Sequence, residues 1–226
     1  MQKYIDILKN NDLFSGICTE NIGKILDYFN AKTRRFNAGE YIFKKNDDLD
    51  KIALFVEGGA QIVNEDFWGN TTVLDQIGIG SIFGEAHSLL PYDTPTVNVI
   101  EVCPTTVLFI DIECILAPVL EIGECQSKLR SNMMRIMARK IIDHAHKIEH
   151  ISRRSTRQKL LSYFTEQMNK HHSPSFDIPF TRQQLADYLS VDRSAMSSEL
   201  SKMQRDGLIR YNLNHFELLS SSEYVS

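Results

Sequence analysis

The sequence lacks any apolar run near the ~18 residues that a transmembrane helix needs, which argues against a membrane-spanning protein. Its first residues, MQKYIDILKNNDLF, mix charged and apolar side chains, unlike a secretory signal. Cysteines are few, and no two form a Cys-x-x-Cys pair: Cys18, Cys103, Cys114 and Cys125. This usage indicates reduced thiols, so we expect a cytoplasmic protein.

Arrangements that carry catalysis are also missing. Residues ~1–110 contain one histidine, His87, whereas a cupin-like β-roll enzyme needs several histidines and a carboxylate around one metal. There is no Ser-His-Asp arrangement, phosphate-binding loop or carboxylate pair with an evident role. We therefore predict no catalytic residues and no metal site. Two alternatives stay open: such an enzyme, which metal analysis would detect, and a small-molecule-binding module whose output is a protein partner.

Lys and Arg are slightly outnumbered, 25 against 29 Asp and Glu, and they are unevenly distributed. The 226 residues carry a formal net charge of −4, with 42% hydrophobic and 24% charged residues, which is ordinary for a globular protein of one large or two modest domains. Residues 152–226 hold ten Lys and Arg against eight Asp and Glu, whereas the remainder is acidic. So small a cationic excess predicts modest, salt-sensitive nonspecific binding to nucleic acid.

The segment 181–208, TRQQLADYLSVDRSAMSSELSKMQRDGL, has the start and stop signals of two short helices joined by a tight turn. Thr181 followed by Gln184 is a capping-box pattern, in which the hydroxyl accepts from the backbone N–H three residues on and the Gln reaches back. Asp192 is a good N-cap for the second helix. Gly207 suits the left-handed position that follows a helix.

The second of these helices separates an apolar face from a small polar one. Met196, Leu200 and Met203 recur at i, i+4 and i+7 and predict the side that faces a core. At ~100° per residue, the other side collects Arg193, Ser194, Ser197, Ser198, Ser201 and Arg205. Serine is a mediocre helix former, so a serine-lined face indicates a helix that lies close to bases and phosphates. We interpret the segment as a helix-turn-helix that enters a DNA major groove; the alternative is a helical hairpin with a solvated serine face.

Residues ~1–110 predict a mainly β domain after a short helical start. Short β-rich runs alternate with turn signals, at 40–44, 52–56, 60–63, 71–74, 94–100 and 105–110. The Gly58-Gly59 pair is a hairpin signal. Many short runs at near-regular spacing favour a small sandwich or jelly roll.

Residues ~112–151 change to a helical period. A heptad-like seam runs through Met133, Met137, Ile141, His144, Ile148 and Ile151, as in a coiled coil. Pro118 lies near the start, where a helix tolerates proline. A helix of ~40 Å is too long to bury both flanks against one small domain. We expect a parallel homodimer along this seam; packing against the β domain is the alternative, and both can hold on different faces of the helix.

Residues 152–226 begin with a polar hinge, SRRSTR, and continue with a helix. A proline-rich loop at 171–179 leads into the helix-turn-helix, and a β-hairpin with its turn at 212–214 follows as a wing. The predicted fold is therefore α+β in three parts: a β-roll at 1–116, a long dimerisation helix at 117–151 and a winged helix-turn-helix at 152–226.

This order of parts resembles the cyclic-AMP receptor protein and fumarate-nitrate regulator (Crp/Fnr) superfamily of bacterial transcription factors. The resemblance covers almost the full chain and is carried by IALFVEGGAQIV at 52–63, GSIFGEAHSLL at 80–90 and the helix-turn-helix at 181–208. It implies a jelly-roll domain like a cyclic nucleotide-binding domain, and a homodimeric, sequence-specific regulator of a near-palindromic double-stranded DNA operator. RNA polymerase is a further partner that the resemblance implies.

The family's base- and phosphate-contacting positions fall on Arg193, Ser194 and Ser198. Arg193 keeps the family's arginine, which fits bidentate contact with a guanine. Ser194 stands where many members have Glu, and Ser198 where many have Arg, so the operator sequence of those members does not carry over. Arg182, at the start of the first helix, suits a phosphate contact that fixes register. The predicted DNA-binding set is Thr181, Arg182, Arg193, Ser194, Ser197, Ser198 and Lys202.

The family's effector pocket also has counterparts here. In cyclic-nucleotide-binding relatives, a Gly-Glu pair such as Gly84-Glu85 holds the ribose, and an Arg followed by a small hydroxyl residue grips the cyclic phosphate. That second place falls on Pro95-Thr96, and proline offers no charge to a buried phosphate. The position that meets adenine falls near His144. We expect a pocket at Gly84, Glu85, Thr96 and His144 that does not take cyclic AMP. No cofactor is predicted; an unknown small-molecule effector, an empty pocket and a purely structural turn stay open.

Other sensing chemistries have less support. Iron–sulfur members use clustered N-terminal cysteines, and only Cys18 lies there; Cys103, Cys114 and Cys125 are too widely spaced for usual cluster ligation and are more often buried small hydrophobes. Haem ligation would call on His87 and His144, for which a packed or solvated histidine is the simpler interpretation.

Overall fold

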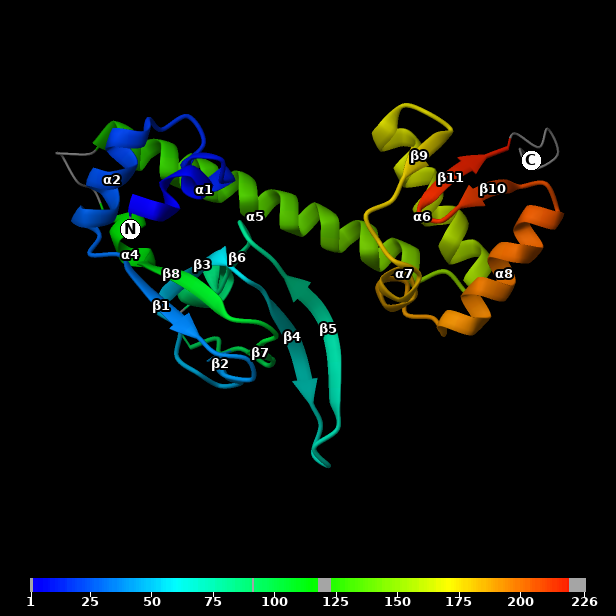
Figure 1. The fold of residues 1–226 in the computed structure, drawn as a ribbon, viewed down its shortest axis with the longest axis horizontal. Coiled ribbons are helices and arrows are strands. Elements are labelled where there is room, and N and C mark those ends of the chain that lie inside the picture. Colours follow the sequence, from blue (N-terminus) through cyan, green and yellow to red (C-terminus); the bar gives the residue numbers. More distant parts are fainter. Residues whose placement is uncertain (1, 91, 118–122, 220–226) are drawn as a thin grey trace. The chain divides into compact units, whose positions relative to one another are not determined.

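The computed structural model describes residues 2–90, 92–117 and 123–219 (Figure 1). The chain divides into two compact units, Met1–Arg139 and Lys140–Ser226. The boundary falls inside the long helix α5 (Gly123–Ile151), so the predicted division at 116 and 151 stays a prediction. Within the described ranges, no helix has the length and apolarity that crossing a bilayer requires.

The first unit combines short helices with two antiparallel sheets. Besides the start of α5, its helices are η1 (Gln2–Tyr4), α1 (Ile5–Lys9), η2 (Asp12–Phe14), α2 (Thr19–Tyr28), α3 (Glu85–Leu89) and α4 (Ile112–Leu116). Its strands are β1 (Lys32–Phe36), β2 (Tyr41–Phe43), β3 (Lys51–Glu57), β4 (Ala60–Glu65), β5 (Thr71–Ile77), β6 (Ile82–Phe83), β7 (Asn98–Glu101) and β8 (Thr105–Asp111).

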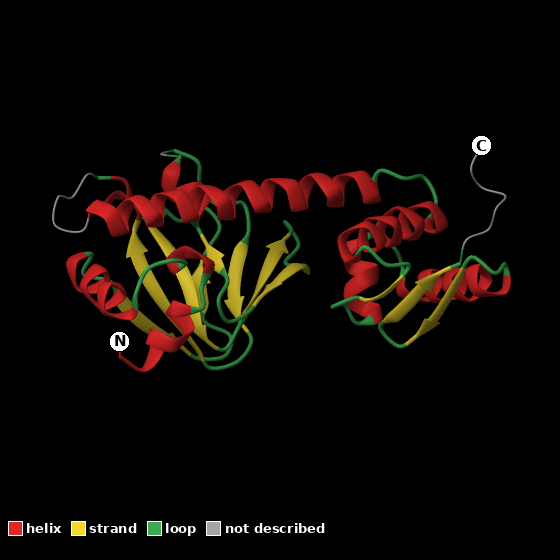
Figure 2. Cartoon of the chain, turned by 90° about the horizontal axis from the view of Figure 1, so that it is seen from above, coloured by secondary structure: helices red, strands yellow, loops and turns green. Residues whose placement is uncertain are grey.

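The sheets have the strand orders β1-β8-β3-β6 and β2-β7-β4-β5. Strand β3 shows how they share the core, because its successive side chains point to opposite faces. Ala53 and Phe55 face the second sheet, whereas Ile52, Leu54 and Val56 join the core formed with the helices. Both faces of β3 are therefore buried, which explains its nearly continuous apolar sequence. The predicted β-roll is confirmed (Figure 2).

In the first unit, the sequence analysis missed two strands, β1 and β6, and predicted a third that is shorter in the structure. Strand β1 reads KTRRF and buries only Phe36, so its pattern carries almost no apolar signal. Strand β6 has two residues. The run predicted at 94–100 forms strand only from Asn98 onward; Pro95, which lacks a backbone N–H, lies in the preceding loop.

Helix α5 is long, as predicted, but in its first half the residues of the predicted seam are covered by the first unit. Met133 is 4% exposed and belongs to the core of the first unit, and Met137 packs against it. These two residues therefore follow the alternative of packing against the β domain. The neighbouring Met134 is exposed (71%), and so are Ile141 (67%) and Ile148 (60%) farther along the helix. Pro118 lies outside the described residues.

The second unit holds the end of α5, the helices α6 (Thr156–His171), α7 (Arg182–Tyr188) and α8 (Arg193–Arg205), and the strands β9 (Ser175–Asp177), β10 (Ile209–Asn212) and β11 (His215–Leu218). The sheet order is β10-β11-β9, and β10–β11 is the predicted wing hairpin. The prediction of a loop throughout 171–179 is wrong, because Phe176 pairs with Phe216 of β11 and is buried. Flanking prolines concealed this three-residue strand.

Candidate nucleic-acid interface

Helix α7 begins with the predicted capping box. The backbone N–H of Gln184 donates to Thr181 Oγ1 (3.3 Å), and Gln184 Oε1 accepts from the backbone N–H of Thr181 (2.8 Å). Leu185, Ala186 and Leu189 are fully buried. The cap thus fixes the first residue of a helix whose inner face lies in the domain core.

The turn between α7 and α8 is tight and uses a left-handed residue. Ser190 has φ 52°, a conformation that non-glycine residues rarely adopt. The backbone N–H of Val191 donates to Ala186 O at 3.0 Å and closes the turn. Asp192 then caps α8, because its Oδ1 accepts from the backbone N–H of Ala195 (2.8 Å). The hydroxyl of Ser194, which also donates to Asp192, and this backbone bond lower the pKa of the Asp192 carboxyl.

Helix α8 separates its faces as the spacing predicts. Met196, Leu200 and Met203 are fully buried in the core of the domain. The opposite face is exposed and includes Arg193, Ser194, Ser197, Ser198, Ser201 and Lys202. Leu208 follows Gly207, whose φ of 72° provides the expected left-handed position after the helix.

Three of the four serine hydroxyls on this face donate their protons to the backbone of α8 or to its N-cap. Ser197 Oγ donates to Arg193 O (2.9 Å), and Ser201 Oγ donates to Ser197 O (3.0 Å). Ser194 donates to Asp192. The hydroxyl oxygens therefore face solvent as acceptors beside short methylene groups. Because these serine side chains are short, a long side chain at the edge of this face projects beyond them.

Arg193 is that long side chain. Among the residues that the structure describes, its guanidinium has no hydrogen-bond or ion-pair partner, and it is exposed at the first position of α8. Lys202 lies 3.9 Å from Glu199 in a loose ion pair. Both side chains are thus available to an anionic or hydrogen-bonding ligand on this face.

Arg182 is placed differently from a free phosphate-binding residue. Its guanidinium lies over the rings of Tyr211 (4.8 Å) and Phe216 (4.9 Å), and Nη2 donates to Leu213 O in the wing turn (2.8 Å). Burial lowers its pKa, and Nη1 is buried with no hydrogen-bond partner in the described chain. Arg182 therefore holds the wing, and its contact with a phosphate stays a prediction.

A brace behind α8 was not anticipated from the sequence. Arg157, in the first turn of α6, binds Glu199 through Nε and Asp206 through Nη2 (2.8 Å). Nearby, Lys159 Nζ donates to Leu189 O (3.1 Å) at the end of α7. Helix α6 is thus fastened to both helices of the motif. Only three-dimensional proximity reveals this, since the partners lie 30 or more positions away in the sequence.

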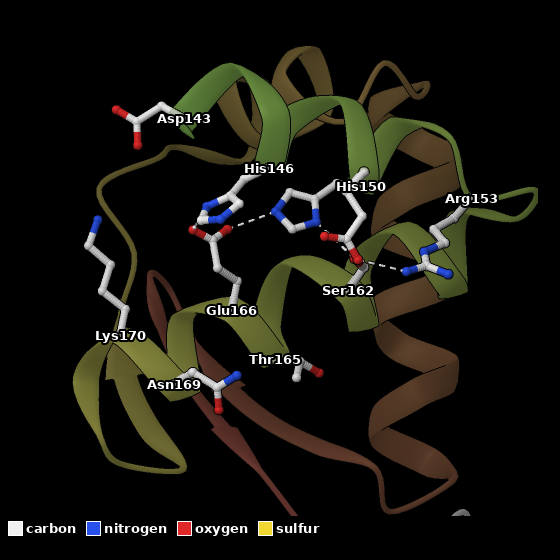
Figure 3. A pocket seen from close by; sticks show the side chains of 10 residues that line it. Asp143, His146, His150, Arg153, Ser162, Thr165, Glu166, Asn169 and Lys170 are labelled. Carbon is white, nitrogen blue, oxygen red and sulfur yellow. Dashed lines mark hydrogen bonds and ion pairs between the residues drawn. The ribbon is translucent and has the colours of Figure 1, made fainter. Parts of the chain in front are cut away.

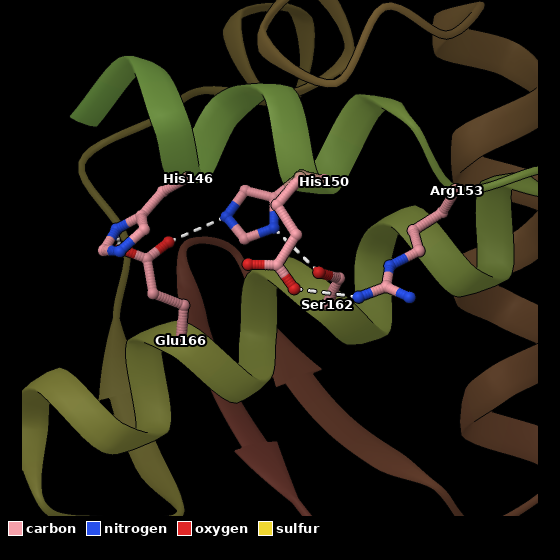
Figure 4. A network of polar contacts seen from close by, with 6 residues as sticks. His146, His150, Arg153, Ser162 and Glu166 are labelled. Carbon is pink, nitrogen blue, oxygen red and sulfur yellow. Dashed lines mark hydrogen bonds and ion pairs between the residues drawn. The ribbon is translucent and has the colours of Figure 1, made fainter. Parts of the chain in front are cut away.

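A cleft of about 580 Å³ lies between the end of α5 and α6 (Figure 3). Its floor is a polar network in which one carboxylate, Glu166, meets two imidazoles, His146 and His150 (Figure 4). The sequence analysis did not select these residues, although His146 and His150, like Ser162 and Glu166, have the i, i+4 spacing of one helix face.

The predicted effector residues are found in both units. Gly84 has φ 87°, and Glu85, which follows it at the start of α3, is 6% exposed. Thr96 is exposed in the loop before β7. His144 is exposed on α5 in the second unit, so its participation in a pocket with the other three stays a prediction.

The cysteines and histidines weighed for metal or haem are dispersed. Cys18 is exposed, while Cys103, Cys114 and Cys125 are partly buried and unbridged. Burial raises the pKa of the Cys114 thiol. His87, in α3, places its Nδ1 3.3 Å from Asp93 O in the loop that follows this helix. No group of three or more His, Cys, Asp or Glu in the described ranges could hold a metal ion.

Two family profiles match the sequence. The profile of the cyclic nucleotide-binding domain matches residues 33–117, and that of the Crp-like helix-turn-helix domain matches residues 158–221. Electron transport regulator A of Shewanella oneidensis is 23% identical over 195 residues, which is 81% of this chain and 73% of that protein. The matched segments contain the two β-sheets and the helix-turn-helix described above.

Solved structures share the fold. CprK complexed with OCPA has a TM-score of 0.66 at 13% identity, covering 86% of this chain and 91% of CprK. The c-di-GMP responsive global regulator CLP of Xanthomonas campestris has a TM-score of 0.58 at 16% identity, covering 88% of this chain and all of CLP. At these identities, the likeness concerns the architecture alone.

Proposed function

Because the chain belongs to the Crp/Fnr family of transcription regulators, we propose that it is a homodimer that binds a specific DNA operator. One observation carries this proposal: the exposed, serine-lined face of α8 begins at the guanidinium of Arg193, which has no partner among the described residues. Recognition helices of this motif touch base edges with their N-terminal residues, and Arg193 occupies that end.

The geometry supports a division of roles on this face. Arg193 would read a guanine through two parallel hydrogen bonds, the commonest specific contact in the major groove. Ser194, Ser197 and Ser198 would lie close to the bases, where hydroxyl oxygens accept from exocyclic amino groups and methylenes contact thymine methyls. Lys202, farther along the helix, would contact a phosphate. Because only one long side chain on this face, Arg193, would contact bases, we expect few specified base pairs in each half-site.

The exposed face of α5 supports the homodimer. Met134, Ala138, Ile141, Ala145 and Ile148 are all exposed, and they recur at steps of four and three along one helix, the spacing of a coiled-coil seam. This seam replaces the predicted one in the first half of α5, where Met133 and Met137 are packed. Large residues alternate with alanine along this seam, and its steps of four and three place Met134, Ile141 and Ile148 at equivalent positions of successive heptads. A two-fold axis then requires a near-palindromic operator with half-sites ~34 Å apart.

Selection of bound sites from random DNA tests the operator. We expect wild type to enrich a near-palindrome, and Arg193→Ala to lose ~1–3 kcal/mol and relax one base position in each half-site. Lys202→Ala is the matched comparison: it should weaken binding to all sequences about equally and reduce the salt slope by about one. Unchanged base preference in the Arg193 variant would refute its assignment.

Substitution on the seam tests the homodimer. Ile141→Asp places a charge in the centre of the proposed interface, whereas Ile142→Asp places the same charge on a neighbouring exposed position (53%) that flanks the seam. Sedimentation equilibrium should show much stronger dissociation of the first variant than of the second. A monomeric wild type, or equal effects of the two substitutions, would contradict the proposed seam.

We also propose that cyclic AMP is not the effector. Pro95 occupies the place of the family's phosphate-gripping arginine, and its side chain is buried without charge. Leaving a buried phosphate without a cation costs several kcal/mol. Titration calorimetry should detect no binding of cyclic AMP, and operator affinity should not change when it is added. A ligand panel tested on Gly84, Glu85 and Thr96 variants would then examine the pocket for other small molecules.

A further inference from the structure

The last turns of α5 are attached to the second unit mainly by polar contacts. The apolar core of this unit is built from α6, α7, α8 and the three strands, and among the described residues no residue of α5 belongs to it. Two contacts of α5 involve aromatic rings: His150 lies near the ring of Tyr163 (5.8 Å), and Lys147 lies over the ring of Tyr188 (5.3 Å). The direction of α5 on this unit thus depends on a few directional interactions.

Glu166 is at the centre of those interactions. Its Oε1 lies 2.9 Å from His146 Nδ1, and its Oε2 lies 2.7 Å from His150 Nε2. The other nitrogen of His150, Nδ1, lies 2.8 Å from Ser162 Oγ. The His150 side chain is 3% exposed, against 25% for Glu166 and 43% for His146. Figure 4 shows the carboxylate from α6 reaching between the two imidazoles of α5.

This arrangement resists rotation as well as separation. His146 and His150 lie one turn apart on α5, and Ser162 and Glu166 lie one turn apart on α6. Hydrogen bonds at two successive turns fix an angle between the helices, which a single bond would not. An ionised carboxylate can only accept, so each imidazole nitrogen facing Glu166 carries a proton, and His150 Nδ1 accepts from Ser162 when the ring is neutral.

The position of α6 determines that of the recognition helix. Arg157 binds Glu199 and Asp206 at the middle and end of α8, and Lys159 binds the end of α7. Helices α6, α7 and α8 also share one apolar core. Helices α6 and α8 therefore move together, so the angle between α5 and α6 also sets the orientation of the α8 face that begins at Arg193.

We propose that Glu166 is a positioning residue that sets the half-site spacing accepted by the dimer. The inference rests on the proposed function, since spacing has meaning only for two DNA-binding domains joined along α5. Successive base pairs are rotated by ~34° and separated by ~3.4 Å, so an insertion of one base pair demands a new angle between each domain and its helix. The Glu166 bonds oppose that change, and base readout by α8 does not depend on them.

The test uses the full-length protein and duplexes with identical half-sites whose centre is shortened or lengthened by one or two base pairs. Three variants are compared with wild type by gel-shift titration: Glu166→Ala, Glu166→Gln and, as the matched control, Glu149→Gln. Glu149 lines the same cleft but pairs in the described structure only with Arg153, in the turn that follows α5 (2.8 Å), so it does not bind α6.

We expect wild type and E149Q to prefer one spacing, and E166A to reduce that preference about tenfold while its half-site base preference stays unchanged. E166Q should keep most of the preference. Its amide oxygen accepts from His146, and its N–H donates to His150 Nε2 once the proton of that ring moves to Nδ1 and is donated to Ser162. Rescue by this uncharged isostere would show that bond geometry, rather than charge, positions the domain.

Two results would overturn the inference: an E166A spacing profile identical to wild type, or an equal loss of affinity at every spacing, which would indicate a local stability effect. Thermal unfolding of each variant checks folding, and should E166A be unfolded, His146→Ala, which removes the most exposed member of the network, carries the same test. A wild type that selects no sequence would refute the proposed function itself. Specific half-site binding with unaltered spacing in these variants would refute only the role of Glu166.

Discussion

The role of Arg182 can be decided by removing its planar guanidinium in two ways. Arg182→Ala deletes the side chain, whereas Arg182→Lys keeps a positive charge near the same place. In the structure, the guanidinium covers Tyr211 and Phe216 and donates to Leu213 O. Lysine has neither the planar fork nor the stacking surface. If Arg182 holds the wing, the two variants should therefore behave alike.

The expected loss of stability is modest because two effects oppose each other. Stacking on partly buried rings contributes roughly 0.5–2 kcal/mol, and a hydrogen bond from a charged donor about 1.5–3 kcal/mol. Against this, Nη1 is buried without a partner in the described chain, and removing it relieves a desolvation cost of about 1–3 kcal/mol. We expect both variants to lower the free energy of unfolding by roughly 1–2 kcal/mol, measured by urea denaturation.

Salt dependence of operator binding separates this role from a phosphate contact. A residue that only holds the wing leaves the slope of log affinity against log salt unchanged in both variants. A residue that binds a phosphate would reduce the slope by ~0.9 in Arg182→Ala and restore it in Arg182→Lys. That second pattern, with unaltered stability, would refute the reasoning from the structure and confirm the prediction from the sequence.

Three other substitutions test features of the first unit. Glu101 is 2% exposed, both carboxylate oxygens lack hydrogen-bond partners in the described chain, and burial raises its pKa. The contribution of Glu101 to stability is therefore fully present below its unfolded-state pKa and is lost as pH rises through its folded-state pKa. Glu101→Gln should raise the free energy of unfolding by about 1–3 kcal/mol at pH 7 and change it little near pH 4. Denaturant titrations of wild type and variant at the two pH values measure this. Gly84 has φ 87°, and an added Cβ would lie 3.2 Å from Lys51 O, so Gly84→Ala should cost about 1–2 kcal/mol in urea denaturation. Gly23 lies inside α2 with open space around it, so Gly23→Ala should instead stabilise by about 0.5–1 kcal/mol; destabilisation by that substitution would show that the helix interior is not as open as described.

Local signals predicted the helix-turn-helix closely. The capping box of Thr181 and Gln184, the Asp192 cap and the buried row of Met196, Leu200 and Met203 are all present. Each depends on residues within about one or two helical turns, where sequence spacing and spatial distance correspond. For the same reason, short strands with a polar or proline-flanked sequence, such as β1 and β9, left no readable pattern.

The long helix shows where periodicity fails. Spacing alone selected Met133, whereas the structure buries that side chain in the first unit and exposes Met134 beside it. A heptad pattern gives the angular spacing of apolar residues around a helix but not which of two adjacent stripes meets another chain. That choice depends on where the β-roll lies against the first turns of α5.

The sequence by itself determined the order of parts, the recognition face of α8 and the caps that bound its helices, because these follow from neighbours along the chain. Tertiary structure alone decided which stripe of α5 stays exposed, that Arg182 grips the wing, and that Glu166 joins two histidines to α6. These contacts join residues that are distant in the sequence or lie on different elements, and the packing of the core, which no local pattern encodes, brings them within hydrogen-bonding distance.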